Sequence, residues 1–365
     1  MIGFRVALAG AITAMLVVAG GAVVVRSSPR PATPLAFIAG GRAPGAGAGA
    51  VGGGGPAVAA SVSRSIGPNA RPLSSPKQLE TALGALGYRL PVGAAVYAAK
   101  ISREGGGLAY DDYQAGGGAL AADFWPASSI KVLAAIGALE LVGAQGFTGA
   151  ATVRFGNGAP RTIRSIYDGA IRISSNADYD LLVRLAGVDW LNDQFLTPAR
   201  GFPVTVIQKS YTAGGNVRST PAVTLSEGGR TATIPARAAG RDVSCAQVNC
   251  SNLFEMSESI RRVVLHNEIP ESDRFRISAA DAAALTDALL GAEGWFEPAV
   301  ARVLGPTARI YGKPGWVPAN DCLAVTLIAA RGQRYLLSAT VPERTGGCPA
   351  LVTLAQNVLR VLSAP

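Results

Sequence analysis

A low-complexity stretch near the N-terminus limits what this chain can fold into. From Ser27 to about Ala70 the sequence consists mainly of Gly, Ala, Pro and Ser, and nine of the sixteen residues from Gly40 to Gly55 are glycine. Such a segment has too few large apolar side chains to build a core. We therefore predict a flexible linker over residues 27–74 and a folded domain over residues 75–365, which is long enough to bury a sizeable core.

The first 26 residues have the pattern of an export signal. Arg5 is followed by twenty uncharged residues from Val6 to Val25, and then by Arg26. A basic start before an apolar run of this length is typical of export, and the segment is then either cleaved as a signal peptide or kept as a signal anchor. We expect an exported protein, periplasmic or extracytoplasmic. If the segment is kept, residues 6–25 would tether the protein to the inner membrane.

Net charge and histidine content exclude several classes of function. The formal net charge is +9, but no run of basic residues is interleaved with aromatic ones, so we expect no nucleic-acid partner. His266 is the only histidine, which excludes a zinc site with several histidines. Residues 257–266 have a helical pattern, and we interpret His266 as a surface or packing residue. We expect no metal and no cofactor.

Hydrophobic patterns place strands at both ends of the domain and helices between them. Ser75 and Pro76 are typical N-cap and N1 residues, so a helix is expected to begin there. The other predicted helices cover residues 129–143, 174–186, 277–290 and 351–362, and the predicted strands cover residues 92–99, 108–113, 308–311, 323–330 and 335–341. This order predicts an α+β fold with one antiparallel sheet built from both ends of the domain, flanked by helices.

Four cysteines in an exported chain predict two disulfides. Cys245 and Cys250 are close enough in sequence to close a small loop. Cys322 opens one strand of the last predicted hairpin and Cys348 follows the other strand, so a bond across that hairpin is geometrically reasonable.

The strongest chemical pattern is Ser128-x-x-Lys131 at the start of an apolar helix. Residues i and i+3 share a helix face, so the Lys131 amine can take a proton from the Ser128 hydroxyl if burial and the helix dipole lower its pKa. A serine nucleophile is then activated without histidine. The same spacing occurs at Ser74 and Lys77, where helix capping is a sufficient explanation.

Two further short motifs follow in the chain. Ser174-x-Asn176 begins another apolar helix and offers a hydroxyl to relay a proton and an amide to hold a substrate carbonyl. Lys313-x-Gly315 precedes the last hairpin, where Lys313 supplies a positive charge for a carboxylate and Gly315 lets a substrate backbone approach. The amide of Trp316 could donate a hydrogen bond to an oxyanion.

These three motifs, in this order, resemble those of the penicillin-binding protein and serine β-lactamase superfamily, and the layout of residues 75–365 is most similar to class A β-lactamases. The resemblance implies a β-lactamase/transpeptidase-like fold with a mainly helical subdomain. It further implies a nucleophile at Ser128, a general base at Lys131 and a proton relay at Ser174. Substrate would be bound by Asn176 and Lys313, and the amides of Ser128 and Trp316 would form an oxyanion hole.

Two departures from class A β-lactamases bear on activity. The chain has no Glu between Ala177 and Ser226, where the family has the carboxylate that activates the deacylating water. Pro314 stands where the family usually has a hydroxyl residue, so carboxylate recognition is expected to differ.

We therefore predict an exported serine hydrolase that is acylated at Ser128 by an amide, peptide or β-lactam carbonyl, with a small molecule or a peptidoglycan stem peptide as substrate. One alternative is a genuine β-lactamase with a non-standard deacylating residue, for which Asp189 and Asp193 are candidates by position. The other is a catalytically idle peptidoglycan-binding module. The sequence leaves the oligomeric state open.

Overall fold

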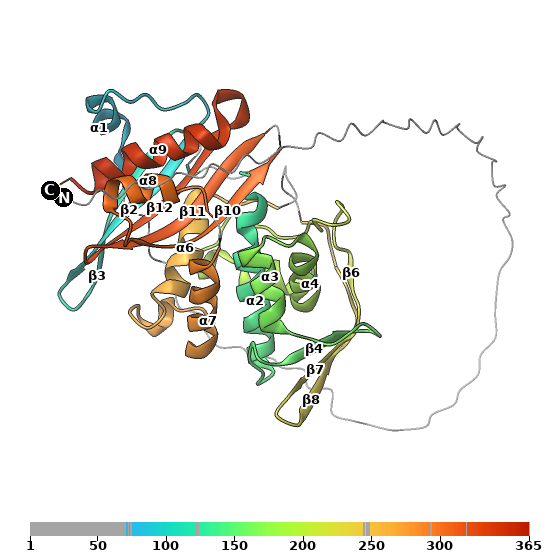
Figure 1. The fold of residues 1–365 in the computed structure, drawn as a ribbon. Helices are drawn as coiled ribbons and strands as arrows, with labels where there is room; N and C mark the ends of the chain where they lie inside the picture. The colour runs from blue at the N-terminus through green and yellow to red at the C-terminus, as the bar shows by residue number, and fades with distance from the viewer. Residues whose placement is uncertain are drawn as a thin grey trace, which may run out of the picture. The chain divides into compact units, whose positions relative to one another are not determined.

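The computed structural model describes residues 71, 73, 75–117, 119, 120, 124–243, 245, 249–292, 294–318 and 320–364 (Figure 1). All of them belong to one structural unit, Ser63–Pro365. The predicted export signal over residues 1–26 and the part of the predicted linker before residue 71 lie outside the described residues.

A six-stranded sheet combines strands from the two ends of the domain. Its order is β1-β3-β2-β12-β11-β10, and every neighbouring pair is antiparallel except β1 with β3. The central pair, β2 with β12, joins the N-terminal hairpin to the C-terminal strands. The predicted α+β fold is therefore confirmed. The strands are β1 (Lys77–Gln78), β2 (Ala95–Glu104), β3 (Gly107–Ala115), β10 (Arg309–Val317), β11 (Asp321–Ala330) and β12 (Gln333–Pro342).

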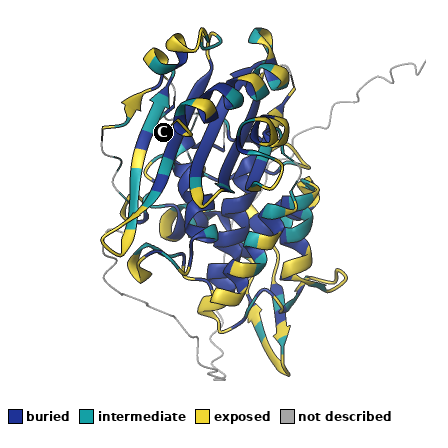
Figure 2. Cartoon of the chain, turned by 60° about the vertical axis from the view of Figure 1, so that its left-hand side comes forward, coloured by how far each residue is buried: buried dark blue, intermediate teal, exposed yellow. Residues whose placement is uncertain are grey.

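Helices cover both faces of this sheet, which is why β11 and β12 are buried along almost their whole length (Figure 2). On one face α9 packs against β11 and β12, and α1 and α8 pack against α9. On the other face α6 contacts β2, β11 and β12, and α7 contacts β10. These helices are α1 (Glu80–Ala85), α6 (Leu253–Val264), α7 (Ala279–Leu290), α8 (Glu297–Leu304) and α9 (Gly347–Leu362).

The middle of the chain forms a mainly helical part around α2 (Lys131–Ala144), with α3 (Ile163–Arg172) and α4 (Asn176–Ala186) packed against it (Figure 1). Every residue of α2 from Lys131 to Val142 is buried. Residues 127–144 are long and apolar enough to cross a membrane, but 83% of that segment is buried inside the fold. We therefore interpret α2 as a core helix.

Several short elements of the described chain were not predicted from the sequence. They are the helix α5 (Val188–Trp190) with a π-helical turn (Leu191–Phe195), the four-stranded sheet β5-β4-β7-β8, the two-stranded sheet β6-β9, and turns of 3-10 helix (Pro198–Arg200, Glu271–Asp273, Glu343–Thr345). The strands of the two small sheets are β4 (Thr152–Phe155), β5 (Arg161–Thr162), β6 (Ser219–Thr220), β7 (Val223–Glu227), β8 (Arg230–Ile234) and β9 (Arg237–Ala238).

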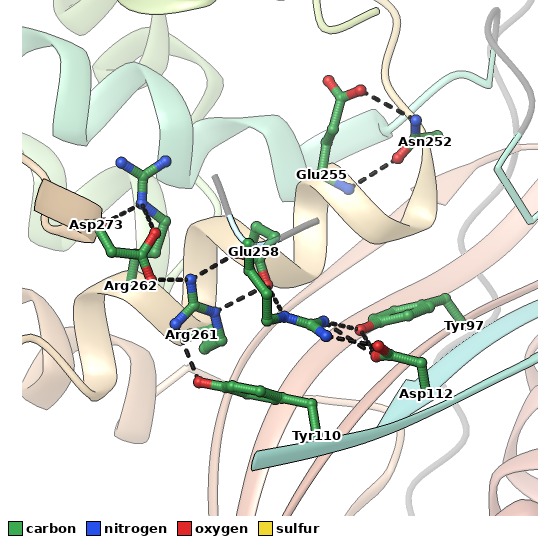
Figure 3. Close-up of polar contacts among 10 residues, drawn as sticks. Tyr97, Tyr110, Asp112, Asn252, Glu255, Glu258, Arg261, Arg262 and Asp273 are labelled. Atoms are coloured by element: carbon green, nitrogen blue, oxygen red, sulfur yellow. Dashed lines mark hydrogen bonds and ion pairs between the residues drawn. The ribbon is translucent and has the colours of Figure 1, made fainter. Parts of the chain in front are cut away.

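Buried ion pairs and hydrogen bonds join α6 to the sheet (Figure 3). Glu258 pairs with Arg261 at 2.7 Å within α6, and Arg261 donates to the Tyr110 hydroxyl of β3 at 3.1 Å. Arg71, which the sequence assigned to the linker, is 12% exposed and donates to Asp112 of β3 at 2.6 Å. Residues 71 and 73 thus pack on the folded domain.

The helix expected to start at Ser75 and Pro76 begins later. Residues Lys77 and Gln78 pair with β3, and α1 starts at Glu80 with Leu79 as its N-cap residue. The prediction from the capping residues was wrong because the backbone of residues 77 and 78 pairs with β3 instead. The amide of Leu79 likewise donates to the carbonyl of Gln114 in β3. Residues 104–107 form the turn that joins β2 to β3.

Both predicted disulfides are present. Cys245 bonds to Cys250, and Cys322 bonds to Cys348. Cys322 lies in β11 directly opposite Trp316 of β10, whereas Cys348 lies in the first turn of α9. The second bond therefore fastens the sheet, close to its β10 edge, to the helix that covers it.

Candidate active site

Ser128 lies in a turn of 3-10 helix, η1 (Ala127–Ile130), that leads directly into α2. The hydroxyl of the neighbouring Ser129 is buried and donates to the carbonyl of Pro126 at 2.5 Å. Ser128 is partly exposed, and none of the described residues hydrogen-bonds its hydroxyl. Of these two adjacent serines, only Ser128 therefore has a hydroxyl available for chemistry.

Lys131 is the first residue of α2, one turn after Ser128, and it is completely buried. Its Nζ donates to the carbonyl of Ser174 at 2.5 Å, to Oδ1 of Asn176 at 2.7 Å and to the hydroxyl of Ser174 at 3.2 Å. Burial, assisted by the positive charge of Lys313, lowers the pKa of Lys131 to about 7. A large fraction of this amine is thus neutral near pH 7 and able to accept a proton.

Ser174 and Asn176 approach Lys131 from the junction between α3 and α4. Ser174 has a φ of 57°, in the left-handed region, and the next residue, Ser175, is the N-cap of α4, whose hydroxyl accepts from the amide of Asp178 at 3.2 Å. The capping role in this motif therefore belongs to Ser175. Asn176 is the first helical residue, and its amide oxygen is left to accept from Lys131.

Lys313 lies on the edge strand β10 and is 1% exposed. Burial lowers its pKa to about 8, so the amine is mostly charged at pH 7. None of the described residues hydrogen-bonds its Nζ. A buried ammonium without a partner is costly, so an anionic group of a ligand would be stabilised beside it.

Gly315 and Pro314 both suit a strand that lies at the edge of the sheet and packs closely against the Ser128 turn. A Cβ atom at Gly315 would lie 3.0 Å from Cβ of Ala127 and 3.0 Å from Cγ of Leu323. Only glycine therefore lets β10 pack this closely against the turn that carries Ser128. Pro314 lies opposite Ala324 on β10, which has no described strand on its outer side, and this is where a sheet tolerates proline.

The Trp316 side chain is turned to another partner. It is 54% exposed, and its Nε1 donates to Oε1 of Glu343 at 2.6 Å. The role expected for this residue concerns its backbone amide, which directly follows Gly315, and that role stays a prediction.

Tyr211 is a residue of this site that the sequence reasoning missed. Its hydroxyl donates to the carbonyl of Ala127 at 2.7 Å, and its ring centroid lies 5.8 Å from Nζ of Lys131. Burial raises the pKa of Tyr211 to about 12, so the phenol is neutral. No sequence motif surrounds Tyr211, and it lies far along the chain from Ser128. Its contact with the site could be recognised only from the folded structure.

A buried carboxylate of α4 fixes the loop that carries Tyr211. Asp180 accepts hydrogen bonds from the Ser210 hydroxyl at 2.6 Å, the Tyr211 amide at 2.7 Å and the Thr212 amide at 3.0 Å. The Tyr211 ring also stacks on that of Tyr179, with centroids 4.5 Å apart. The loop is thus attached to the same helix that begins with Asn176.

The two carboxylates considered for deacylation both have other partners. Asp189 accepts from the amide of Gly240 at 2.9 Å and lines a separate pocket of about 280 Å³. Asp193 pairs with Arg241 at 2.7 Å at the surface. Neither interacts with a described residue of the three motifs.

His266 follows the C-terminal end of α6 and is 7% exposed. Burial lowers its pKa, so the imidazole is neutral at pH 7. None of its described interactions involves Ser128 or Lys131. Among the described residues, no group of three or more His, Cys, Asp or Glu side chains could hold a metal ion.

Comparison with known proteins relates the fold to solved structures. No family model matches the sequence. No curated protein matches it. Among solved structures, a class A β-lactamase from Mycobacterium abscessus is 16% identical, with a TM-score of 0.53, and the match covers 78% of this chain and 99% of that one.

Two further structures match over similar lengths. A mutant of PBP-A, solved as an acyl-enzyme complex with penicillin G, is 17% identical, with a TM-score of 0.54 over 79% of this chain and 98% of its own. A variant of the last common ancestor of Gram-negative bacteria class A β-lactamase is 16% identical, with a TM-score of 0.54 over 78% of this chain and 96% of its own. The described domain therefore has the fold shared by class A β-lactamases and PBP-A.

Proposed function

We propose that this protein is an exported serine hydrolase that is acylated at Ser128 by an amide, peptide or β-lactam carbonyl, with Lys131 as general base. The observation that carries this proposal is the environment of Lys131. The lysine is completely buried, lies one turn after a serine with a free hydroxyl, and has a pKa of about 7. A lysine that served only to stabilise the helix would be exposed and charged.

In the acylation step, neutral Lys131 accepts the proton of the Ser128 hydroxyl while Oγ forms a bond to the substrate carbonyl carbon. The oxyanion that develops is stabilised by the amides of Ser128 and Trp316. The carbon–nitrogen bond then breaks, and the proton passes from Lys131 through the Ser174 hydroxyl to the leaving nitrogen. The 3.2 Å bond from Lys131 to Ser174 supports this relay. The products are an ester at Ser128 and a free amine.

Substrate binding is assigned to Asn176 and Lys313. Asn176 holds a carbonyl or amide of the substrate, and the ammonium of Lys313 attracts its carboxylate. Because Pro314 has no hydroxyl, one hydrogen bond that the family's motif offers to this carboxylate is lost. A carboxylate-bearing substrate such as a penicillin or a peptidoglycan stem peptide fits this set of groups.

Deacylation is proposed to be slow. The carboxylates whose charges act on Lys131 are Asp178 and Asp180. Asp178 pairs with Arg161, and Asp180 accepts three hydrogen bonds from the Tyr211 loop. The Tyr211 phenol is neutral and does not act as a base. A penicilloyl ester at Ser128 should therefore persist, as expected for a penicillin-binding protein or D,D-peptidase.

Export is part of the same proposal. The pattern of residues 1–26 supports it, and two disulfides are typical of an oxidising compartment outside the cytoplasm. Peptidoglycan lies in that compartment.

Intact-mass analysis after exposure to penicillin G tests the proposal. We expect a persistent adduct with the mass of the whole penicillin on the wild-type protein and on Ser129→Ala, but none on Ser128→Ala. The Ser129 variant is the matched control, because it removes the adjacent hydroxyl. Rapid turnover without an adduct would favour the genuine β-lactamase. Absence of both an adduct and turnover, for penicillin and for peptide substrates, would favour the idle peptidoglycan-binding module.

A further inference from the structure

A hydrogen bond connects the loop that carries Tyr211 to the backbone just before Ser128. The Tyr211 hydroxyl donates to the carbonyl oxygen of Ala127 at 2.7 Å. Ala127 has a φ of 44°, a conformation that costs a non-glycine residue free energy and persists only when its surroundings hold it. The side chain of Ala127 also lies close to β10, because a Cβ atom at Gly315 would come within 3.0 Å of Cβ of Ala127. Ala127 thus has contacts with both the Tyr211 hydroxyl and strand β10.

The carbonyl of Ala127 and the amide of Ser128 belong to the same peptide group. This peptide is trans, so its C=O and N–H bonds lie in one plane and point in opposite directions. A hydrogen bond that fixes the carbonyl therefore also fixes the direction of the Ser128 N–H bond. It also polarises the peptide, which makes the N–H group a stronger donor.

The tyrosine itself is held firmly enough to act in this way. Its amide donates to Asp180, and its ring stacks on Tyr179, so both its backbone and its side chain are attached to α4. The hydroxyl is neutral, because its pKa is raised to about 12, so it remains a donor. A phenol has two rotatable side-chain bonds, which adds little conformational freedom between α4 and Ala127.

We propose that Tyr211 is a positioning residue for the oxyanion hole, because its bond to Ala127 aims the Ser128 amide at the carbonyl oxygen under attack. This inference rests on the proposed acylation of Ser128 and adds a residue to it. No described hydrogen bond joins Tyr211 to the Ser128 hydroxyl, so Tyr211 acts through the Ala127 peptide. Its loss should slow the chemical step and leave substrate binding unchanged.

The test compares Tyr211→Phe with Tyr179→Phe. The first variant keeps the stacked ring and removes the hydroxyl, which donates to Ala127 and also interacts with the side chains of Asn249 and Trp125. The second removes a hydroxyl of the same ring pair, which bonds the carbonyl of Lys209 and the side chain of Asn249 but not Ala127. The rate of penicillin acylation is measured over a range of concentrations, which separates the maximal rate constant from the half-saturating concentration.

We expect Tyr211→Phe to lower the maximal acylation rate about tenfold, which is less than the hundredfold or more lost when an oxyanion-hole donor itself is removed. The half-saturating concentration should stay the same, and Tyr179→Phe should acylate at the wild-type rate. The inference is overturned if Tyr211→Phe acylates within about threefold of wild type, if its defect lies only in the half-saturating concentration, or if Tyr179→Phe is equally slow. Failure of the proposed function would be seen separately, as absence of labelling at Ser128 in the wild-type protein.

Discussion

The positive charge of Lys313 lowers the pKa of Lys131, although one lysine begins α2 and the other lies far along the chain on β10, and each is at most 1% exposed. Burial is the larger cause of this shift and the like charge of Lys313 adds to it, whereas Asp180 and Asp178 oppose it. In our proposal Lys313 binds the substrate carboxylate, so the same residue of β10 also lowers the pKa of the general base Lys131.

Replacing Lys313 by Gln should raise the pKa of Lys131. Removing a nearby positive charge makes the protonated amine less unfavourable, so more alkaline conditions are needed to deprotonate it. The midpoint of the rise in acylation rate with pH should therefore move from about 7 to a higher pH. The same profile for Lys100→Gln, which changes a lysine on β2, serves as the control. A midpoint that stays at the wild-type value in Lys313→Gln would show that the two charges do not interact.

Gly315→Ala should damage both stability and activity. Its new methyl group would lie 3.0 Å from Cβ of Ala127 and from Cγ of Leu323, so β10 or these neighbours have to shift by a few tenths of an ångström. Overpacking of this kind costs about 1–3 kcal/mol, and acylation should slow because the turn shifts with it. Gly84→Ala in α1 is the matched control, because a Cβ there meets no atom within 4 Å. Thermal unfolding and acylation at wild-type levels in Gly315→Ala would refute this packing argument.

The two disulfides should differ in their contributions to stability. In the loop-entropy model, a bond that closes 26 residues, as between Cys322 and Cys348, stabilises by about 3–4 kcal/mol, whereas one that closes five residues contributes about 2 kcal/mol. Chemical denaturation of Cys322→Ala/Cys348→Ala and of Cys245→Ala/Cys250→Ala measures both. Only the first pair should also slow acylation, because Cys322 lies opposite Trp316 at the β10 edge. Equal losses of stability, or normal acylation without the first bond, would contradict this expectation.

Local patterns predicted the parts of the molecule that depend on neighbours in sequence. The hairpin of β2 and β3 follows from two strand-forming segments that are close in sequence with glycines between them, and the motif at Ser128 and Lys131 follows from spacing on one helix face. The sharing of one sheet by strands from both ends of the domain was also predicted, because strands at the two ends with helices between them indicate an α+β fold.

Contacts between distant segments could not be predicted in the same way. Ser75 has good capping chemistry, yet pairing of residues 77 and 78 with β3 shifts the helix start to Glu80. Tyr211 contributes to the site through a single bond to Ala127, and nothing near it in sequence distinguishes it from a packing residue. Arg71 looks like part of the linker, and only its buried ion pair with Asp112 shows that it packs on the domain.

The central claim, that Lys131 activates Ser128, is tested most directly by the rate of penicillin acylation between about pH 5 and 9. The wild-type rate should rise with pH through a midpoint of about 7, as Lys131 loses its proton. Lys131→Ala should abolish acylation, while His266→Ala, which removes the only histidine, should leave the profile unchanged. Loss of the alkaline rise in His266→Ala, together with near-normal acylation in Lys131→Ala, would contradict the account.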